Sequence, residues 1–340
     1  MLSQILNKIS SFHNLTSDSP THHQLIRCMQ AAGLRYSPHA WRSRFGEHNL
    51  NFAADACEYL EFKHYLARLV SHYCPEFMPE TYIIDNCSWS MVISEIANKY
   101  YYQNEAEFQD CVPNLAWILK PALLNNGQHI KIFDRLSQIE EHFLNPSHVG
   151  GPHVLQRYIS NPDLYEGRKH SLRFFVVITQ EAGAFLYRQG YLNVALKAYA
   201  ANDYNDLSLH LTNEHLSHDT VNIVQIPTTD QQVAALFPQI TTIVRAVTNG
   251  LENAFPHAYQ RSRDRTLAFF GFDFLVDSQK KVWILEANHG PCFPIDETHA
   301  LHQSLYQPFW NAVFQQFIMP IIKKRPMNGL GDAGFIAMRS

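Results

Sequence analysis

Two hydrophobic runs late in the chain, residues 269–277 and 281–288, constrain the fold most, because their pattern and short separation predict a β-hairpin. Alternation places Asp273 on the face opposite its aromatic neighbours, and it gives Glu286 and Asn288 a common face. Carboxylates with an amide oxygen suit Mg²⁺ that keeps some waters and shares phosphate ligands. The pattern predicts a magnesium and nucleotide site. The alternative is an ordinary amphipathic hairpin with its acids in water.

Composition excludes several classes of protein. The chain has 340 residues, of which 46% are hydrophobic, so it can form large cores. A formal net charge of -4, without a dense Lys/Arg cluster, argues against a nucleic-acid partner. The sequence offers neither a secretory signal nor an apolar run able to span a bilayer. The six cysteines lack metal or redox spacing, so we expect them to be reduced and mostly buried in a cytoplasmic protein, with signal-independent export left open.

The order of predicted elements indicates a mixed α/β protein. A capped helix from Ser19 to Gly33 ends a small N-terminal unit, and a long helix is expected over residues 53–73. Strands and helices then alternate, which is typical of layered folds. Strands are expected at residues 79–84, 116–120, 130–133, 154–159, 170–179 and 184–191. Helices are expected at residues 89–102, 229–255 and 301–318, and a short helix that ends at Leu144 is expected after the strand at 130–133. Residues 329–340 are expected to form a loosely attached tail.

Lys120 closes an apolar strand and precedes the polar loop of residues 125–129, here called the flap. This arrangement can direct an ammonium group at a phosphate beneath a mobile loop. The flap has a single glycine, Gly127, so a strand-end lysine that reaches into solvent is an equal alternative. A later strand ends at a segment that can offer backbone groups to an adenine edge, or can be purely structural, namely Gln156, Arg157, Tyr158 and Ile159.

Three cations lie on or beside the next two predicted strands. Lys169, Ser171 and Arg173 share one face by alternation, and Arg188 lies on the following strand. Cations that line a cleft need anions, and arginine favours planar contact with a carboxylate or phosphate. Arg173 and Arg188 are therefore candidates to hold a substrate carboxylate or an acyl phosphate. Cations that protect an exposed sheet edge are the alternative reading.

The segment from His210 to His218 contains histidines and a glutamate, but their spacing fits neither order of the helical zinc motif. We prefer Thr212 and Asn213 as loop donors near a ribose or phosphate. Cys292 lies close to the hairpin in sequence, although no nearby base favours a reactive thiol.

Taken in order, these residues resemble the tubulin-tyrosine ligase family of ATP-grasp ligases. The resemblance covers about residues 63–288. Its motifs are Trp117-Ile118-Leu119-Lys120-Pro121, Gln156-Arg157-Tyr158-Ile159, Arg168-Lys169 with Leu172-Arg173, Tyr187-Arg188-Gln189-Gly190, His210-Leu211-Thr212-Asn213, Phe270-Gly271-Phe272-Asp273 and Glu286-Ala287-Asn288. Lys63 is similar to an early nucleotide-contacting lysine of the family.

The resemblance implies an α+β ATP-grasp fold with two subdomains around ATP. The expected divisions are an N-terminal domain (1–56), a central subdomain (57–157), a C-terminal subdomain (158–325) and a tail (326–340). The same resemblance implies that the nucleotide is approached by Lys63, Lys120, Gly127 and Lys169, that adenine is held by residues 156–159, and that the ribose and phosphate side is held by Thr212 and Asn213. It also implies that Arg173 and Arg188 stabilise the transferring phosphoryl group and the acyl phosphate. The implied Mg²⁺ ligands are Asp273, Glu286 and Asn288.

Two positions depart from the family pattern. Ser171 stands where the family usually carries aspartate, and His129 stands where it usually has a second flap glycine. The first change removes a negative charge beside the site, which is expected to weaken contacts with a substrate amine or a metal. The second is expected either to stiffen the flap or to alter its approach to phosphate.

The first hypothesis is an ATP- and Mg²⁺-dependent ligase that joins an amino-acid donor to a protein or peptide acceptor through an acyl phosphate, with tubulin as one possible acceptor. The second is an inert nucleotide-binding module of the same fold, motivated by Ser171 and the flap. The third is a phosphotransferase acting on a hydroxyl, for which the sequence lacks a catalytic-loop motif.

Overall fold

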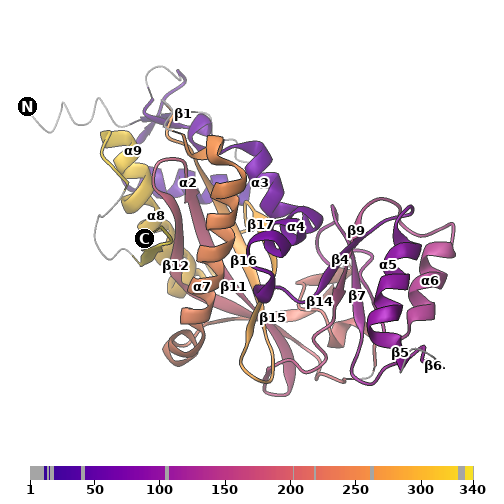
Figure 1. Ribbon diagram of the computed structural model, residues 1–340. Helices are drawn as coiled ribbons and strands as arrows, with labels where there is room; N and C mark the ends of the chain where they lie inside the picture. The colour runs from indigo at the N-terminus through magenta and orange to yellow at the C-terminus, as the bar shows by residue number, and fades with distance from the viewer. Residues whose placement is uncertain are drawn as a thin grey trace, which may run out of the picture.

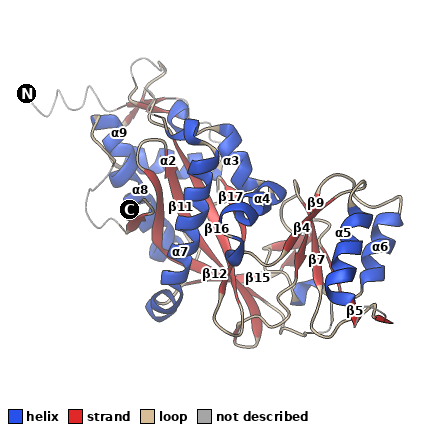
Figure 2. Cartoon of the chain, viewed as in Figure 1, coloured by secondary structure: helices blue, strands red, loops and turns tan. Residues whose placement is uncertain are grey.

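Two unequal lobes, each built on its own β-sheet, make up most of the molecule (Figure 1). The computed structural model describes residues 11–13, 15, 19–39, 43–103, 107–201, 203–217, 220–260, 264–327 and 334–339. Within these residues, none of the helices has the length and apolar character needed to cross a bilayer. The mixture of helices and sheets (Figure 2) is consistent with the α+β class expected from the sequence.

The large lobe is centred on a seven-stranded sheet whose main path runs β15-β12-β11-β16-β17. All four neighbouring pairs on this path are antiparallel. Two short strands, β10 and β18, pair with β11 and β12. The bounds are Leu164–Tyr165 for β10, Arg168–Thr179 for β11, Gly183–Ala195 for β12, Ile223–Pro227 for β15, Leu267–Val276 for β16, Val282–His289 for β17 and Phe335–Ala337 for β18.

Helices cover both faces of the large sheet, which is why its strands are almost continuously apolar. On one face, Phe174 and Phe272 pack against α3, α4 and α7. On the other, Phe175 and Phe269 pack against α2 and the closing helical segment. These elements are α2 (Pro20–Ala31), α3 (Ala54–Glu61), α4 (Lys63–Tyr73), α7 (Asp230–Ala254), and a final run of π turns and helices comprising His302–Tyr306, α8 (Gln307–Val313), Phe314–Ile318 and α9 (Met319–Lys323).

The small lobe has a four-stranded antiparallel sheet in the order β4-β9-β7-β8. Its core lies between this sheet and two helices, with Trp117, Tyr101 and Ile139 fully buried. The elements are β4 (Thr81–Ile84), α5 (Trp89–Ile96) with a π turn at Ala97–Tyr101, the pair β5 (Tyr102–Gln103) and β6 (Glu107–Phe108), β7 (Trp117–Pro121), β8 (Lys131–Phe133), α6 (Leu136–Leu144) and β9 (His153–Arg157).

The described N-terminal residues and the segment after β12 each pack against one of the two lobes. The described residues before position 56 include β1 (Ser11–His13), β2 (Arg35–Tyr36) and β3 (Phe45–Gly46), but Phe12, Leu25 and Phe45 share a core with the large lobe. Helices α3 and α4 also pack on the large sheet. The segment after β12 returns to the small lobe, where Leu211 packs against Ile118 and Tyr158. It contains a 3₁₀ turn at Leu207–Leu209 and the pair β13 (His215–Ser217) and β14 (Thr220–Val221).

Three expectations were wrong. The helix expected over residues 53–73 is interrupted at Phe62, whose extended backbone (φ -78, ψ 122) separates α3 from α4. The end of the chain is not a loose tail, because β18 pairs with β12 and Met338 is buried; part of the expected tail lies outside the described residues. The cysteines are free, but Cys87, Cys111 and Cys292 are exposed rather than buried, since they lie in or next to loops.

Candidate functional site

A cleft of about 520 Å³ between the lobes collects most of the residues singled out in the sequence. Its lining includes Lys63, Lys120, Gly127, Gln156, Arg157, Tyr158, Ile159, Lys169, Arg173, Thr212, Asn213, Asp273, Glu286 and Asn288. One face of the large sheet changes from apolar to polar where it meets the cleft. On β11, Phe175 belongs to the core, whereas Arg173, on the same face two positions earlier, lines the cleft.

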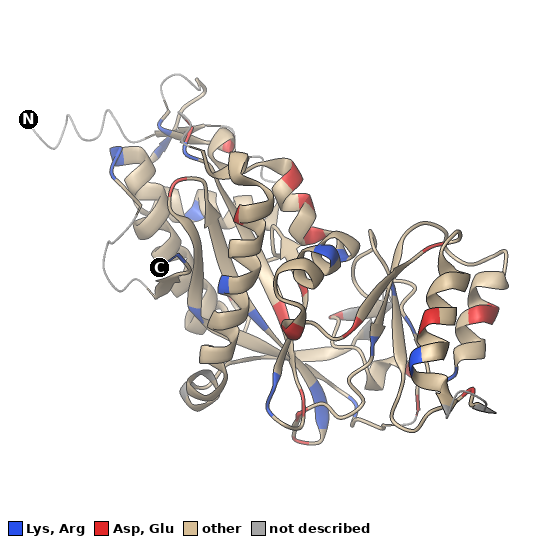
Figure 3. Cartoon of the chain, in the orientation of Figure 1, with Lys and Arg blue, Asp and Glu red and all other residues tan. Residues whose placement is uncertain are grey.

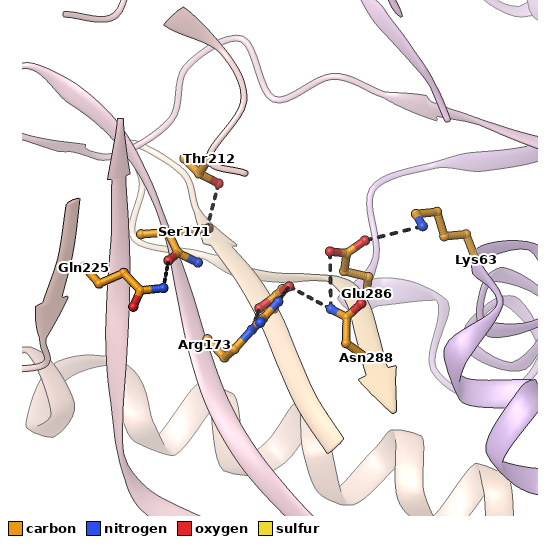
Figure 4. A network of polar contacts seen from close by, with 9 residues as sticks. Lys63, Ser171, Arg173, Thr212, Gln225, Glu286 and Asn288 are labelled. Carbon is orange, nitrogen blue, oxygen red and sulfur yellow. Dashed lines mark hydrogen bonds and ion pairs between the residues drawn. The ribbon is translucent and has the colours of Figure 1, made fainter. Parts of the chain in front are cut away.

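The β16–β17 hairpin brings the predicted metal ligands together. Asp273 lies directly opposite Glu286, and Gly271 lies opposite Asn288. The Asn288 amide nitrogen donates to Asp273 Oδ2 at 3.0 Å and to Glu286 Oε1 at 3.3 Å, as the dashed lines in Figure 4 show. These contacts place the three side chains around one point, where rotation of the amide would present its oxygen to a cation.

Arg173 holds Asp273 from the neighbouring strand. Its guanidinium donates from Nε to Oδ1 at 2.6 Å and from Nη2 to Oδ2 at 2.5 Å. The register of β11 and β16 makes the two residues direct partners. Such bidentate pairing fixes both the orientation and the charge of the carboxylate.

Burial and the surrounding cations give the two acids of the hairpin different pKa values. Burial raises the pKa of Asp273 to about 6, which the Arg173 guanidinium offsets only in part. Burial acts in the same direction on Glu286, but Lys63 and Lys120 outweigh it and lower the pKa of Glu286 to about 2. Glu286 is therefore a carboxylate at neutral pH, as a hard-cation ligand must be.

Two buried lysines line the cleft, and among the described residues neither ammonium is hydrogen-bonded to a carboxylate. Lys120 Nζ donates to Gln156 Oε1 at 2.9 Å, and Lys169 Nζ donates to the Tyr158 hydroxyl at 2.7 Å. Burial is the main reason that the pKa of Lys120 falls to about 8 and that of Lys169 to about 7. Each charge is disfavoured until an anion arrives, which is the electrostatic condition of a phosphate site.

The break at Phe62 explains how Lys63 reaches the same place. Lys63 becomes the first residue of α4, and its Nζ donates to the Leu124 carbonyl at 2.7 Å. The same nitrogen lies 3.8 Å from Glu286 Oε2. Lys63 thus connects the hairpin to the segment that leads into the flap.

The strand end proposed for adenine lies on the cleft wall, but part of its backbone is already committed. The N–H of Arg157 donates to the Glu80 carbonyl and that of Tyr158 to the Ala116 carbonyl, each at 2.8 Å. These bonds commit the N–H groups of Arg157 and Tyr158, so neither can serve a base edge.

Thr212 and Asn213 face the two walls of the cleft. Thr212 donates its hydroxyl to Ser171 Oγ at 2.8 Å, so the segment anchored on the small lobe also contacts the large sheet. A Cβ at Gly127 would lie 3.2 Å from Asn213 Oδ1, which places the flap against this segment.

The flap backbone is left-handed at several positions. Asn126, Gly127 and His129 have φ values of +55, +72 and +56. The histidine that replaces the expected second glycine therefore occupies a conformation that glycine adopts more readily.

His210 is not available as a zinc ligand. Its Nδ1 contacts the Tyr158 hydroxyl at 2.9 Å and its Nε2 contacts the Asp203 carbonyl at 2.7 Å. Among the described residues, no group of three His, Cys, Asp or Glu side chains is arranged to hold a metal ion. A cation bound at the hairpin would therefore need the Asn288 amide oxygen or ligands from a phosphate or water.

A family model described as the tubulin-tyrosine ligase family matches residues 57–327, which is most of the chain. The chain belongs to the tubulin-tyrosine ligase family. This confirms the resemblance drawn from the ordered motifs.

Relatives within the family carry names of amino-acid-adding enzymes. The protein polyglycylase TTLL10 of Macaca fascicularis is 27% identical, over 64% of this chain and 38% of its own length. The probable tubulin polyglutamylase ttll-9 of Caenorhabditis elegans is 24% identical, over 56% of this chain and 49% of its own length. The tubulin glycylase 3D of Tetrahymena thermophila is 24% identical, over 52% of this chain and 18% of its own length. The chain thus spans less than half of each of these family members.

Against the family pattern, one expected residue falls outside the cleft and several unexpected ones line it. Arg188 is exposed, near the irregularity in the pairing of β12 with β11, and is not part of the cleft lining. The alternation of β12 and β15 could have identified Asn193 and Gln225, which line the cleft beside Ser171. Glu214 lies in an irregular loop, where no periodic pattern marks it.

Proposed function

We propose that the chain is an ATP- and Mg²⁺-dependent ligase that adds an amino acid to a protein or peptide through an acyl phosphate. Family membership and the names of the relatives support the reaction class. The observation that carries the proposal is the meeting of two kinds of group in one cleft. Lys120 and Lys169, whose pKa values are lowered by burial, suit phosphates. The acids and the amide of the hairpin suit a hard cation.

The residues would divide the work by their position. Lys63, Lys120 and Lys169 would bind phosphates, and the strand end from Gln156 to Ile159 would hold the base. Asp273, Glu286 and Asn288 would hold Mg²⁺, which neutralises charge on the transferring phosphoryl group. Arg173, already fixed by Asp273, would stabilise the substrate carboxylate and the acyl phosphate.

The groups in the cleft suit a reaction that needs its substrates aligned more than one that needs a proton removed from a hydroxyl. Phosphoryl transfer asks the protein mainly for alignment and charge neutralisation, which the cations and the hairpin would supply. The competing proposal of an inert module rests on Ser171 and on the strained flap at His129. It retains nucleotide binding but lacks amine-dependent turnover.

Mass spectrometry tests the proposal directly. Wild-type protein and Glu286→Gln would be incubated with Mg-ATP, all common amino acids, and either tubulin or a mixed protein lysate. We expect added amino-acid masses with wild type alone, which would also identify donor and acceptor. Nucleotide binding without any addition would favour the inert module.

A further inference from the structure

Helix α2 lies outside the part of the chain that the family model matches, yet it contacts one wall of the cleft. The match begins at residue 57, whereas α2 spans Pro20–Ala31. Thr21 Oγ1 donates to the Pro291 carbonyl at 3.0 Å, and Gln24 Nε2 donates to the Pro294 carbonyl at 2.8 Å. The segment from Pro291 to Pro294, here called the rim, lines the cleft.

The sequence pattern of α2 explains these contacts. Thr21, Gln24, Leu25 and Met29 recur at helical spacing and form its buried face. Leu25 and Met29 belong to the same core as Phe293 of the rim, which is fully buried. The buried hydroxyl and amide at the start of this face need partners, and the rim carbonyls accept from both. Core packing and hydrogen bonds therefore hold the rim on α2.

The rim begins three residues after Asn288 and lies beside Arg173. A Cβ built at Gly271 would lie 3.1 Å from Arg173 Cδ and 3.3 Å from Pro291 Cβ, so both side chains pack over this glycine. Cys292, the next residue of the rim, is exposed. Partial burial raises the pKa of its thiol, and the positive charge of Arg173 acts in the opposite direction. The rim thus borders the guanidinium to which the proposed function assigns the substrate carboxylate.

The charged contacts of α2 lie just beyond the rim, at the surface. Arg27 Nη1 donates to the Ile295 carbonyl at 3.2 Å, and the Arg27 guanidinium pairs with the exposed Glu297. Basic and acidic residues are interspersed over the large lobe (Figure 3). Because an ion pair in contact with water contributes little, the buried contacts of Thr21 and Gln24 are the ones that fix the rim.

We propose that α2 is a positioning element for the acceptor: Thr21 and Gln24 fix the rim beside Arg173, and the fixed rim binds the acceptor peptide next to its reacting carboxylate. This inference rests on the proposed ligase function, with the added amino acid supplying the amine and the acceptor the carboxylate. An acceptor carboxylate held by Arg173 carries a peptide chain, which must leave the cleft along a neighbouring wall. Lys120 and Lys169 belong to β7 and β11, so a displaced rim weakens the hold on the acceptor and leaves ATP binding intact.

Alkylation of Cys292 tests the positioning of the rim without any turnover. Thr21→Val and Gln24→Met keep the approximate size of each side chain and remove its hydrogen-bond donor. In the variant with both changes, we expect iodoacetamide to label Cys292 about 3- to 10-fold faster than in wild type, because a released thiol regains its ordinary pKa. Cys87 and Cys111 are exposed internal controls, read by peptide mass spectrometry, and should label at unchanged rates. Unchanged labelling of Cys292 would overturn the inference.

Kinetics with tubulin as the acceptor test the second step. ADP release would be measured with Mg-ATP, all common amino acids and tubulin. For the variant with Thr21→Val and Gln24→Met we expect the KM for tubulin to rise by about 10-fold, the loss of two neutral hydrogen bonds, and the KM for ATP to stay unchanged. Thr21→Ser, which keeps the hydroxyl, and Gln30→Met, at an exposed position of the same helix, should match wild type.

The outcomes separate this inference from the ligase proposal. An unchanged KM for tubulin, or an equal rise in the KM for ATP, would overturn the acceptor role of α2 while the ligase stands. If wild type releases no ADP with tubulin, the ligase proposal fails, and the acceptor role fails with it whatever the labelling of Cys292 shows.

Discussion

The two walls of the cleft hold their functional groups in different ways. On the large-lobe wall, Arg173, Asp273 and Asn288 are joined by hydrogen bonds on a sheet packed on both faces. On the small-lobe wall, Lys120 donates to the side chain of Gln156, and the flap backbone beside it is left-handed at Asn126, Gly127 and His129. We infer that the large-lobe wall is assembled before substrates bind, whereas the small-lobe wall completes its contacts around the nucleotide.

Removing Arg173 should produce the largest effect, because the large-lobe wall depends on its pairing with buried Asp273. Arg173→Ala leaves that carboxylate without its partner and is expected to lower the free energy of unfolding by about 3–5 kcal/mol. It is also expected to abolish ligation. Chemical denaturation measures the first effect.

Arg188→Ala is the matched control for stability, since Arg188 is exposed on the adjacent strand, and its cost should stay within about 0.5 kcal/mol. Arg173→Met combined with Asp273→Asn removes both charges and should cost less than Arg173→Ala alone. Equal costs for the single and double variants would contradict a preassembled ion pair. The catalytic role predicted for Arg188 is tested by the turnover of the same control variant.

Lys169→Met should raise the free energy of unfolding, whereas Arg173→Ala lowers it. Burial disfavours the Lys169 charge, and this penalty is complete below the folded pKa of about 7 and fades as pH rises toward the ordinary lysine value. The variant should therefore be more stable without nucleotide by about 1–2 kcal/mol at or below pH 7. It should also lose the increase in melting temperature that Mg-ATP gives wild type. Lys131→Met, on an exposed strand position, should do neither; a destabilised Lys169→Met would contradict the account.

ATP binding should be accompanied by proton uptake. With folded pKa values of about 8 and about 7, Lys120 and Lys169 are partly deprotonated at pH 8, and bound phosphates would raise both values. We expect uptake of about one proton at pH 8 and less at pH 6. Calorimetry in buffers of different ionisation enthalpy measures it. Binding without proton uptake at pH 8 would show that these lysines do not meet the phosphates.

The flap should give the smallest effects. Gly127→Ala places a Cβ in a left-handed conformation and 3.2 Å from Asn213, so it should destabilise by about 1 kcal/mol and weaken ATP binding. His129→Gly relieves strain at φ +56 and should be neutral or stabilising by up to about 1 kcal/mol. Gly150→Ala, whose backbone is not left-handed and whose new Cβ meets only Asn86 at 4.0 Å, is the control. Equal signs for the two flap variants would argue against a strained His129.

Much of the site followed from the alternation of side chains along strands. The pattern around Asp273 and Glu286 predicted the hairpin. The pattern around Lys169 and Arg173 predicted that these two side chains face the cleft together. The pairing of Arg173 with Asp273 did not follow, because it depends on the register of strands separated by 100 positions in the sequence.

Other features were invisible for related physical reasons. Phe62 carries no sequence signal for a helix break, and the turn there is supported by the hydrogen bond from Lys63 N–H to the Ala122 carbonyl at 3.3 Å. Strand β18 is too short to show alternation and owes its place to pairing with β12.

The most direct test of the central claim is ADP release by wild type and Glu286→Gln, with tubulin and amino acids added separately and together. The account predicts release that depends on acceptor and amine in wild type and falls by at least about 1,000-fold in the variant, whose fold stays intact. Full turnover in Glu286→Gln would contradict the assignment of the hairpin. Binding of ATP by wild type without any such release would contradict the ligase.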